Sequence, residues 1–331
     1  QALSQLNVAG VDENERFRIH GCLLLVLQRQ ESRHERDTLS GERAHPASDS
    51  DKVMGYQMDR VRTTLVVALL SATVAAHGQA VSTYDCRHTS TAPVIDGDGG
   101  DSAWTRAPGL NLVDVEDLTG QRQHSRPTVA RMLWDEDNLY FLFEMIDADV
   151  WSTFDNRDDQ IWQQEVVEIF IDPDGDGLDY AEIEVNPLNT IFDLLLSRPW
   201  ADSGRGFAEW NPDFVSAVSV DGTLNDPDDV DQGWTVEVAL PWAALATDIR
   251  DVMNGQSLPP NVGDRWRLNL YRWERPRVGT DVTGEEPSAW SPVGDNDFHR
   301  PDRFGWLTFV GVPTAVEAEP WARVKSEATA W

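Results

Sequence analysis

IWQQEVVEIFID, residues 161–172, runs directly into PDGDGLDY, residues 173–180. Within this stretch the apolar side chains of Val167, Ile169 and Ile171 fall on one face of an extended chain, whereas Glu168 falls on the other face. A period of two residues predicts a β-strand with one buried face. The aspartates and glycines that follow predict a turn at its end.

The same alternation recurs along the chain between residues 93 and 311. TVARMLWD (128–135) and NLYFLFEMID (138–147) are separated by the short polar turn Glu136-Asp137, which predicts a β-hairpin. The other extended runs are AEIEVNP (181–187), TIFDLLL (190–196), DFVSAVSV (213–220), GWTVEVAL (233–240), RWRLNLYR (265–272) and FGWLTFV (304–310). With about nine strands, this pattern predicts an all-β, antiparallel β-sandwich of the immunoglobulin-like or jelly-roll-like kind. The pattern also predicts one short helix, PWAALATDI (241–249), because Pro241 suits a first helical turn.

The segment that precedes these strands, residues 58–80, reads MDRVRTTLVVALLSATVAAHGQA. Its basic head, apolar run and small residues at the end are typical of a secretory signal peptide, which predicts a secreted protein, extracellular or periplasmic. The apolar run is shorter than the roughly 20 residues that a membrane-spanning helix needs, so no membrane partner is expected. We expect residues 1–57 to be an upstream extension outside the mature protein, 81–311 to form the sandwich, and 312–331 to be a tail or linker.

Composition narrows the possible partners. The 331 residues carry a formal net charge of −30, so the overall field repels a phosphate backbone and argues against a nucleic-acid partner. The sequence also lacks a serine nucleophile elbow, a phosphate-binding loop and an HExxH zinc motif. These absences favour a binding function over an enzymatic one.

Several strands share a polar face opposite their apolar one. Glu168, Glu184 and Asn269 fall on this face, and Trp162 lies in a polar loop just before one of the strands. Aromatic side chains beside carboxylates and amides favour sugar binding, since pyranose C–H groups stack on π-systems while ring hydroxyls pair with polar groups. An ordinary solvated sheet face and a packing role for Trp162 are the alternatives.

Five segments in order resemble the family 9 carbohydrate-binding modules and the wider family-9-like group of the DOMON superfamily. They are PVIDGDGGDSAW (93–104), ARMLWDEDNLYFLFEMID (130–147), IWQQEVVEIFIDPDGDG (161–177), GWTVEVALPW (233–242) and FHRPDRFGWLTF (298–309). The resemblance spans about 93–310 and implies a non-catalytic β-sandwich that binds a polysaccharide or oligosaccharide. It also implies glycoside hydrolases acting on the same glycan as partners, and calcium in the loops.

The resemblance also implies roles for individual residues. Trp162 and Phe298 would be the two walls of a slot for a sugar ring, with Phe298 standing where the characterised binders have tryptophan. Glu168 matches a hydrogen-bonding carboxylate, and Asn269 falls where a glutamine contacts sugar. Glu184 replaces the sugar-binding arginine of the family, which exchanges a bidentate donor for an acceptor and changes the hydroxyl pattern that is accepted.

The aspartate-rich turn is a candidate calcium site. Asp172, Asp174, Asp176 and Asp179 can supply several of the oxygen ligands that calcium prefers, so we expect a structural calcium ion there. An acidic hairpin turn without a metal is the alternative.

Two other functions are left open. Glu168 and Glu184 would be the acid and base of a glycoside hydrolase if they flanked a scissile bond. Met132, Met145 and His299 are candidate axial ligands of a haem-binding, electron-transfer module, although methionines in apolar strands are usually core residues.

Overall fold

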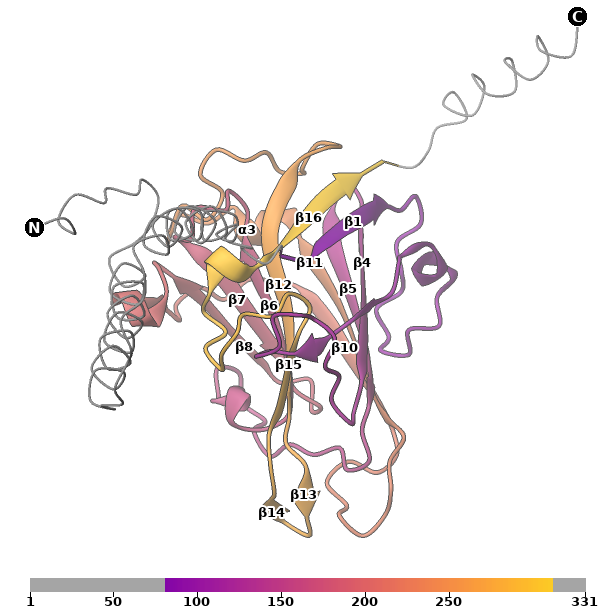
Figure 1. Cartoon of the computed structure of the whole chain (residues 1–331). Coiled ribbons are helices and arrows are strands. Elements are labelled where there is room, and N and C mark those ends of the chain that lie inside the picture. Colours follow the sequence, from indigo (N-terminus) through magenta and orange to yellow (C-terminus); the bar gives the residue numbers. More distant parts are fainter. Residues whose placement is uncertain (1–80, 312–331) are drawn as a thin grey trace, which may run out of the picture. The chain divides into compact units, whose positions relative to one another are not determined.

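The computed structural model describes residues 81–311 (Figure 1). The predicted upstream extension, signal peptide and tail lie outside the described residues, so these three assignments stay predictions. Among residues 81–311, no helix combines the length and the apolar character needed to cross a membrane.

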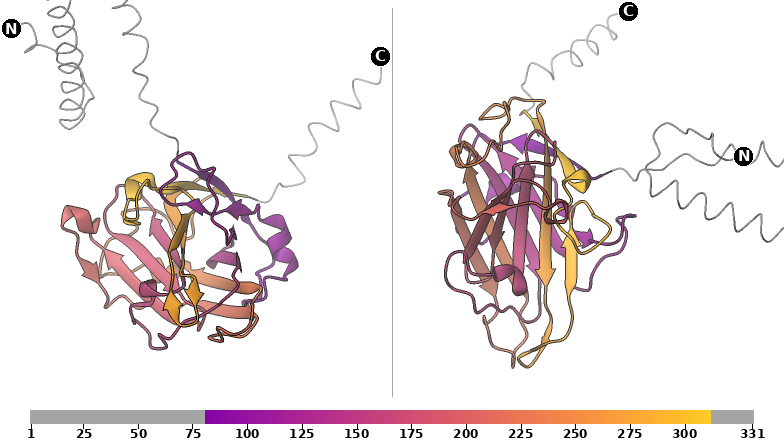
Figure 2. Two further views of the ribbon diagram at one scale, coloured as in Figure 1. Left: turned by 60° about the horizontal axis from the view of Figure 1, so that its bottom comes forward. Right: turned by 90° about the vertical axis from the view of Figure 1, so that its left-hand side faces the viewer.

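One curled sheet of fourteen strands forms both layers of a β-sandwich (Figures 1 and 2). The first layer contains, in order, β10 (Val215–Asp221), β11 (Gly233–Pro241), β5 (Asn138–Ile146) and β4 (Thr128–Trp134). The second contains β12 (Arg265–Glu274), β6 (Val166–Asp172), β7 (Tyr180–Val185), β8 (Ile191–Leu196) and β9 (Gly206–Phe207). Between them in strand order lie β1 (Thr83–His88) and β16 (Gly305–Val310). The predicted all-β sandwich is confirmed.

Short elements complete the described part of the chain. The small strands are β2 (Leu110–Asn111), β3 (Val113–Asp114), β13 (Arg277–Val278), β14 (Asp281–Val282) and β15 (Glu286–Ala289). The helical turns are η1 (Ser102–Arg106), η2 (Ile161–Gln163), η3 (Trp200–Asp202), η4 (Pro301–Arg303) and the single α-helix α3 (Trp242–Leu245). The α-helix begins directly after Pro241 and is shorter than the predicted 241–249, since the Thr247 hydroxyl accepts a hydrogen bond from the Ile249 N–H and so competes with helix continuation.

Strand pairing follows the prediction with one exception. The hairpin of β4 and β5 is confirmed, with Trp134 paired to Leu139 across the predicted turn. β1, in contrast, pairs with both β16 and β4 in parallel, so the sheet is mixed; the other pairs of described strands are antiparallel. β1 joins the two layers, and neither of its partners is its neighbour in sequence.

The main core lies between the two layers. Val167, Ile169 and Ile171 of β6 are each at most 1% exposed, as their alternation predicts. Trp266 and Phe309 pack edge to face in the same core, with ring centroids 4.9 Å apart. Burial of large apolar side chains of this kind is the dominant favourable contribution to folding.

The opposite face of the second layer is not the uniformly polar surface that the alternation predicts. A second apolar cluster covers part of it and includes Phe170, Tyr180, Tyr271, Phe298 and Phe304. The chain between β15 and β16 crosses this face and contributes Phe298 and Phe304 to the cluster. Polar side chains on this face are therefore partly enclosed, and that enclosure forms the candidate site.

Candidate ligand-binding site

A cavity of about 340 Å³ lies over the second layer. Its walls come from η2, β6, β7, β8, η3, β12 and the loop before η4. The lining residues are Trp162, Glu168, Glu182, Glu184, Phe192, Leu194, Trp200, Trp273, Asn296, Asp297, Phe298 and His299. Aromatic rings therefore surround a floor of carboxylates.

Four of the five predicted ligand-binding residues meet in this cavity: Trp162, Glu168, Glu184 and Phe298. The structure does not bring Asn269 to it. Asn269 is fully buried; its Nδ2 donates to Ser291 O at 2.8 Å, and its Oδ1 accepts from Ser291 N at 2.9 Å. The amide that was expected to contact sugar instead fixes the chain after β15 against the sheet.

Phe298 also differs from expectation, because it is only 5% exposed rather than open to solvent. Its ring stacks on Tyr271 at a centroid distance of 4.2 Å and on Trp273 at 5.0 Å. The Tyr271 hydroxyl donates to Phe298 O at 2.9 Å and holds the loop on the sheet. Phe298 is thus one member of an aromatic stack, of which the half-buried Trp273 is the more accessible ring.

Three further aromatic residues line the cavity but were not predicted from the sequence: Trp273, Trp200 and Phe192. Trp273 continues the alternation of β12 two residues after Tyr271, but the predicted strand ended at Arg272, two residues before the end of β12 at Glu274. Trp200 is 47% exposed in a single 3₁₀ turn, where no periodic pattern marks it. Phe192 packs edge to face on Trp162, with centroids 4.8 Å apart.

Arg275 connects two of the aromatic walls. Its Nη2 donates to Trp162 O at 2.8 Å, and its Nε donates to Gln164 O at 3.2 Å. The same guanidinium lies 4.6 Å from the ring centroid of Trp273 and forms an ion pair with Glu285. This arginine positions the walls and uses one N–H of each guanidinium nitrogen in doing so.

His299 is held by two hydrogen bonds at the rim of the cavity. Trp200 Nε1 donates to His299 Nε2 at 3.1 Å, and His299 Nδ1 lies 3.0 Å from the Tyr180 hydroxyl. Because an indole N–H only donates, Nε2 is the acceptor in the hydrogen bond from Trp200. Burial raises the pKa of Glu182, and His299 lowers it.

Three glutamates form the cavity floor. Glu168, Glu182 and Glu184 are all buried, and their carboxylate oxygens lie within 4.8 Å of one another. Burial raises the pKa of Glu184 well above its ordinary value, and the charges of Glu168 and Glu182 raise it further. Burial also raises the pKa of Glu168, which Glu182 raises further and Arg275 lowers.

This floor lacks compensating partners. Glu182 Oε2 and Glu184 Oε2 are buried without a hydrogen-bond partner. Within residues 81–311, no ion pair involves Glu168, Glu182 or Glu184. Buried acceptors without donors are costly in a folded protein, so this arrangement suits a ligand that supplies donors.

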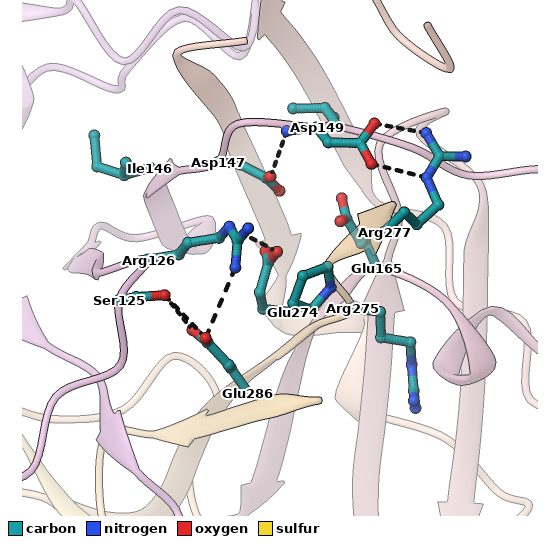
Figure 3. A network of polar contacts seen from close by, with 12 residues as sticks. Ser125, Arg126, Ile146, Asp147, Asp149, Glu165, Glu274, Arg275, Arg277 and Glu286 are labelled. Atoms are coloured by element: carbon teal, nitrogen blue, oxygen red, sulfur yellow. Dashed lines mark hydrogen bonds and ion pairs between the residues drawn. The ribbon is translucent and has the colours of Figure 1, made fainter. Parts of the chain in front are cut away.

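A second buried acidic cluster, Asp147, Glu165 and Glu274, is partly compensated within the protein (Figure 3). Arg272 Nη2 donates to Asp147 Oδ2 at 2.9 Å and also pairs with Glu274. Arg126 Nε lies 3.2 Å from Glu274 Oε1. Arginines therefore pair with two of the three acids of this cluster, while Glu165 Oε1 has no hydrogen-bond partner.

The predicted calcium turn brings three of its four aspartates together. Carboxylate oxygens of Asp172, Asp174 and Asp176 lie within 4.8 Å of one another. Asp172 also accepts from Gly175 N at 3.1 Å and Gly177 N at 3.0 Å, and both glycines have the positive φ that favours glycine. Three carboxylate oxygens that lie this close together are suitable ligands for a hard divalent cation.

Asp179 does not join this group, which corrects the predicted set of four. Its Oδ1 accepts from Arg250 Nε at 2.7 Å. Arg250 already satisfies this carboxylate, so Asp179, the residue just before β7, forms an ion pair with the segment after α3.

A β-sandwich that carries an aromatic-lined cavity over one sheet defines a ligand-binding module. Residues 95–312 match the family model for carbohydrate family 9 binding domain-like proteins. The chain belongs to this family.

Two curated relatives are parts of much longer proteins. The chain is 26% identical over 224 residues to endo-1,4-beta-xylanase A of Thermotoga neapolitana, covering 66% of this chain and 17% of that protein. It is 25% identical over 187 residues to exoglucanase XynX of Acetivibrio thermocellus, covering 56% of this chain and 14% of that protein. The chain thus spans less than a fifth of the length of either relative.

The chain was also compared with solved structures. A putative carbohydrate-binding protein from Bacteroides uniformis aligns with a TM-score of 0.50 at 16% identity, covering 70% of this chain and all of that chain. A family 9 carbohydrate-binding module from Caldicellulosiruptor kristjanssonii, solved with cellotriose, aligns at 0.45 with 16% identity and covers 70% and 96% of the two chains.

Proposed function

We propose that this domain binds a carbohydrate in the aromatic cavity and does not transform it. The observation that carries the proposal is the convergence of Trp162, Trp200 and Trp273, from three separate elements, on one cavity above a carboxylate floor. Aromatic faces stack on the C–H groups of a pyranose ring, and polar groups at the floor pair with its substituents. Membership of a carbohydrate-binding family supports the same function.

The carboxylates support binding rather than hydrolysis. A glycosidase needs an acid and a second carboxylate on either side of the scissile bond, about 5 to 10 Å apart. Glu168 and Glu184 instead are paired residues on adjacent strands of one sheet and lie together at the floor. Met132 is fully buried in the main core while His299 lines the cavity, so this pair offers no common haem site.

A glycan array tests the proposed function. We expect the purified protein to retain a restricted set of glycans, and we expect those glycans to be recovered without new reducing ends after prolonged incubation. An array without any bound glycan would contradict the binding function. Release of new reducing ends that Glu168→Gln abolishes would instead identify a hydrolase.

We further propose that Asp172, Asp174 and Asp176 hold a structural calcium ion at the end of β6. The ion would neutralise three neighbouring carboxylates and fix the β6–β7 turn. Asp172 is the last residue of the strand that carries Glu168, so the turn and the cavity share one element.

Export is proposed from the signal-like segment at residues 58–80. Action beside glycoside hydrolases on the same glycan is proposed because the curated relatives are named a xylanase and an exoglucanase. N-terminal sequencing of protein recovered from the medium or periplasm tests the export proposal; we expect a mature N-terminus between residues 77 and 84. Residues 1–57 on the exported chain would contradict it.

A further inference from the structure

The cavity floor points to the charge of the ligand. We propose that the bound carbohydrate is an amino sugar, whose protonated amine is held by Glu168, Glu182 and Glu184 while its ring lies against the tryptophans. This inference rests on the proposed function and names the class of ligand for the same cavity.

The first step concerns hydrogen-bond donors. Glu182 Oε2 and Glu184 Oε2 are buried acceptors without a partner, and both residues line the cavity. A sugar hydroxyl supplies one donor and no charge, whereas an ammonium group supplies three donors and one positive charge. Of the two, an ammonium group satisfies three adjacent carboxylates more completely.

Two basic side chains of the protein lie near the floor without forming an ion pair with it. Arg275 donates to Trp162 O and Gln164 O and pairs with Glu285. His299 is hydrogen-bonded to Trp200 and to the Tyr180 hydroxyl. Among the ion pairs of the described residues, neither side chain is paired with Glu168, Glu182 or Glu184.

The cluster of Asp147, Glu165 and Glu274 in the same protein also consists of three buried acids (Figure 3). Arg272 pairs with Asp147 and Glu274, and Arg126 pairs with Glu274. Two of the three acids in that cluster therefore have a cationic partner within the protein. The glutamates of the cavity floor lack such partners among the described residues and face a cavity instead, which assigns the missing positive charge to the ligand.

The walls favour an organic cation over a metal ion. Calcium takes 6 to 8 oxygen ligands. The side chains that line the cavity directly beside the glutamate strands are instead those of Phe192, Leu194 and Trp273. Tryptophan faces attract organic cations as well as sugar rings, so a ring bearing an ammonium group uses both kinds of surface.

Calorimetric titration of the whole protein tests the inference with matched ligands. The probes are glucosamine, galactosamine and mannosamine, each beside its parent hexose and its N-acetylated form, which keeps the ring and removes the charge. We expect at least one amino sugar to bind about tenfold or more tightly than both of its neutral counterparts, because hydrogen bonds to charged groups are worth more than neutral ones.

A pair of variants tests whether the cavity floor causes the preference for amino sugars. Glu184→Gln keeps the side-chain shape and removes one negative charge, so we expect it to lower the ratio of amino-sugar to neutral-sugar affinity severalfold. Glu209→Gln, at an exposed position outside the cavity, should leave the ratio unchanged. Circular dichroism checks that both variants fold; should Glu184→Gln fail to fold, the comparison of charged and neutral ligands on the unaltered protein still decides.

Three outcomes overturn the inference. Equal affinity for charged and neutral sugars rejects it and leaves carbohydrate binding intact. Binding of calcium or magnesium that Glu184→Gln abolishes, without any amino-sugar preference, makes the floor a metal site instead. If neither these sugars nor any glycan on the array binds, the proposed function fails and this inference fails with it.

Discussion

Glu168 on β6 and Glu184 on β7 are direct partners across the sheet, and both are buried at the floor of one cavity. Like charges directly opposite each other destabilise a strand pair, and burial adds the cost of removing each charge from water. Burial and the neighbouring carboxylates raise the pKa of both glutamates, which lowers this cost because a protonated carboxyl is neutral. A ligand with a positive charge would also lower this cost, so stability and ligand binding depend on the same residues.

The pH dependence of stability follows from that pair. The pKa of Glu184 in the folded state is raised well above its ordinary value of 4.5 by burial and by Glu168 and Glu182. Below pH 4.5 the Glu184 carboxyl is mostly protonated in both the folded and the unfolded state. As the pH rises above 4.5, the unfolded chain releases this proton while the folded protein retains it, so the free energy of unfolding falls. We expect Glu184→Gln to be more stable than wild type by about 1 to 3 kcal/mol at pH 8 and to differ little at pH 3.5.

Urea unfolding of the two proteins at both pH values measures this difference. The other titratable groups that line the cavity are Glu168, Glu182, Asp297 and His299, and they are the same in both proteins. A gap that is as large at pH 3.5 as at pH 8 would exclude the carboxyl proton as its cause.

Trp273 is predicted to carry more binding energy than Phe298. It is the more accessible ring of the stack, and Trp273→Ala removes an aromatic wall of the cavity. Truncation of an aromatic anchor typically costs about 2 kcal/mol or more, so we expect affinity for the glycan found on the array to fall more than tenfold. Trp306→Ala is the matched control, a half-buried tryptophan outside the cavity, and its affinity should stay at the wild-type value.

Phe298 is predicted to act on stability more than on ligand contact. Its ring stacks on Tyr271 and Trp273 and is almost fully buried. We expect Phe298→Ala to lower the free energy of unfolding by about 3 to 5 kcal/mol, as for other buried phenylalanines. Val278→Ala, at a position that is 72% exposed, should change it by less than about 0.5 kcal/mol. If Phe298→Ala were as stable as wild type, the ring would not contribute to stability as predicted and would be assigned to the cavity wall instead.

Calcium is predicted to stabilise the fold through three aspartates and not through the fourth. At a hundredfold excess of calcium over Kd, binding to the native state alone adds about 2.7 kcal/mol of stability. Thermal melts in EDTA and in excess calcium should therefore differ for wild type and for Asp179→Asn, whose carboxylate is paired with Arg250. They should coincide for Asp172→Asn. A calcium effect that Asp179→Asn alone removes would reverse this assignment.

Local patterns determined much of this protein in advance. A period of two placed Val167, Ile169 and Ile171 in the core and Glu168 on the opposite face, because side chains alternate along any extended chain. The turn at Glu136-Asp137 predicted the β4–β5 hairpin, since a short polar turn between two apolar runs joins neighbouring antiparallel strands. These features depend only on residues close together in the sequence.

Contacts between distant segments decided the rest. β1 inserts in parallel between β4 and β16. Asp179 pairs with Arg250, 71 residues away in the sequence, and the backbone of Ser291 hydrogen-bonds to the side-chain amide of Asn269. Alternation states which face a side chain occupies, but not what covers that face, and the chain between β15 and β16 covers part of the predicted polar surface. This crossing segment buries Asn269 and Phe298, and it leaves Trp162, Glu168 and Glu184 around a cavity. Burial depends on which segments pack together in three dimensions, and the period of a strand does not determine that packing.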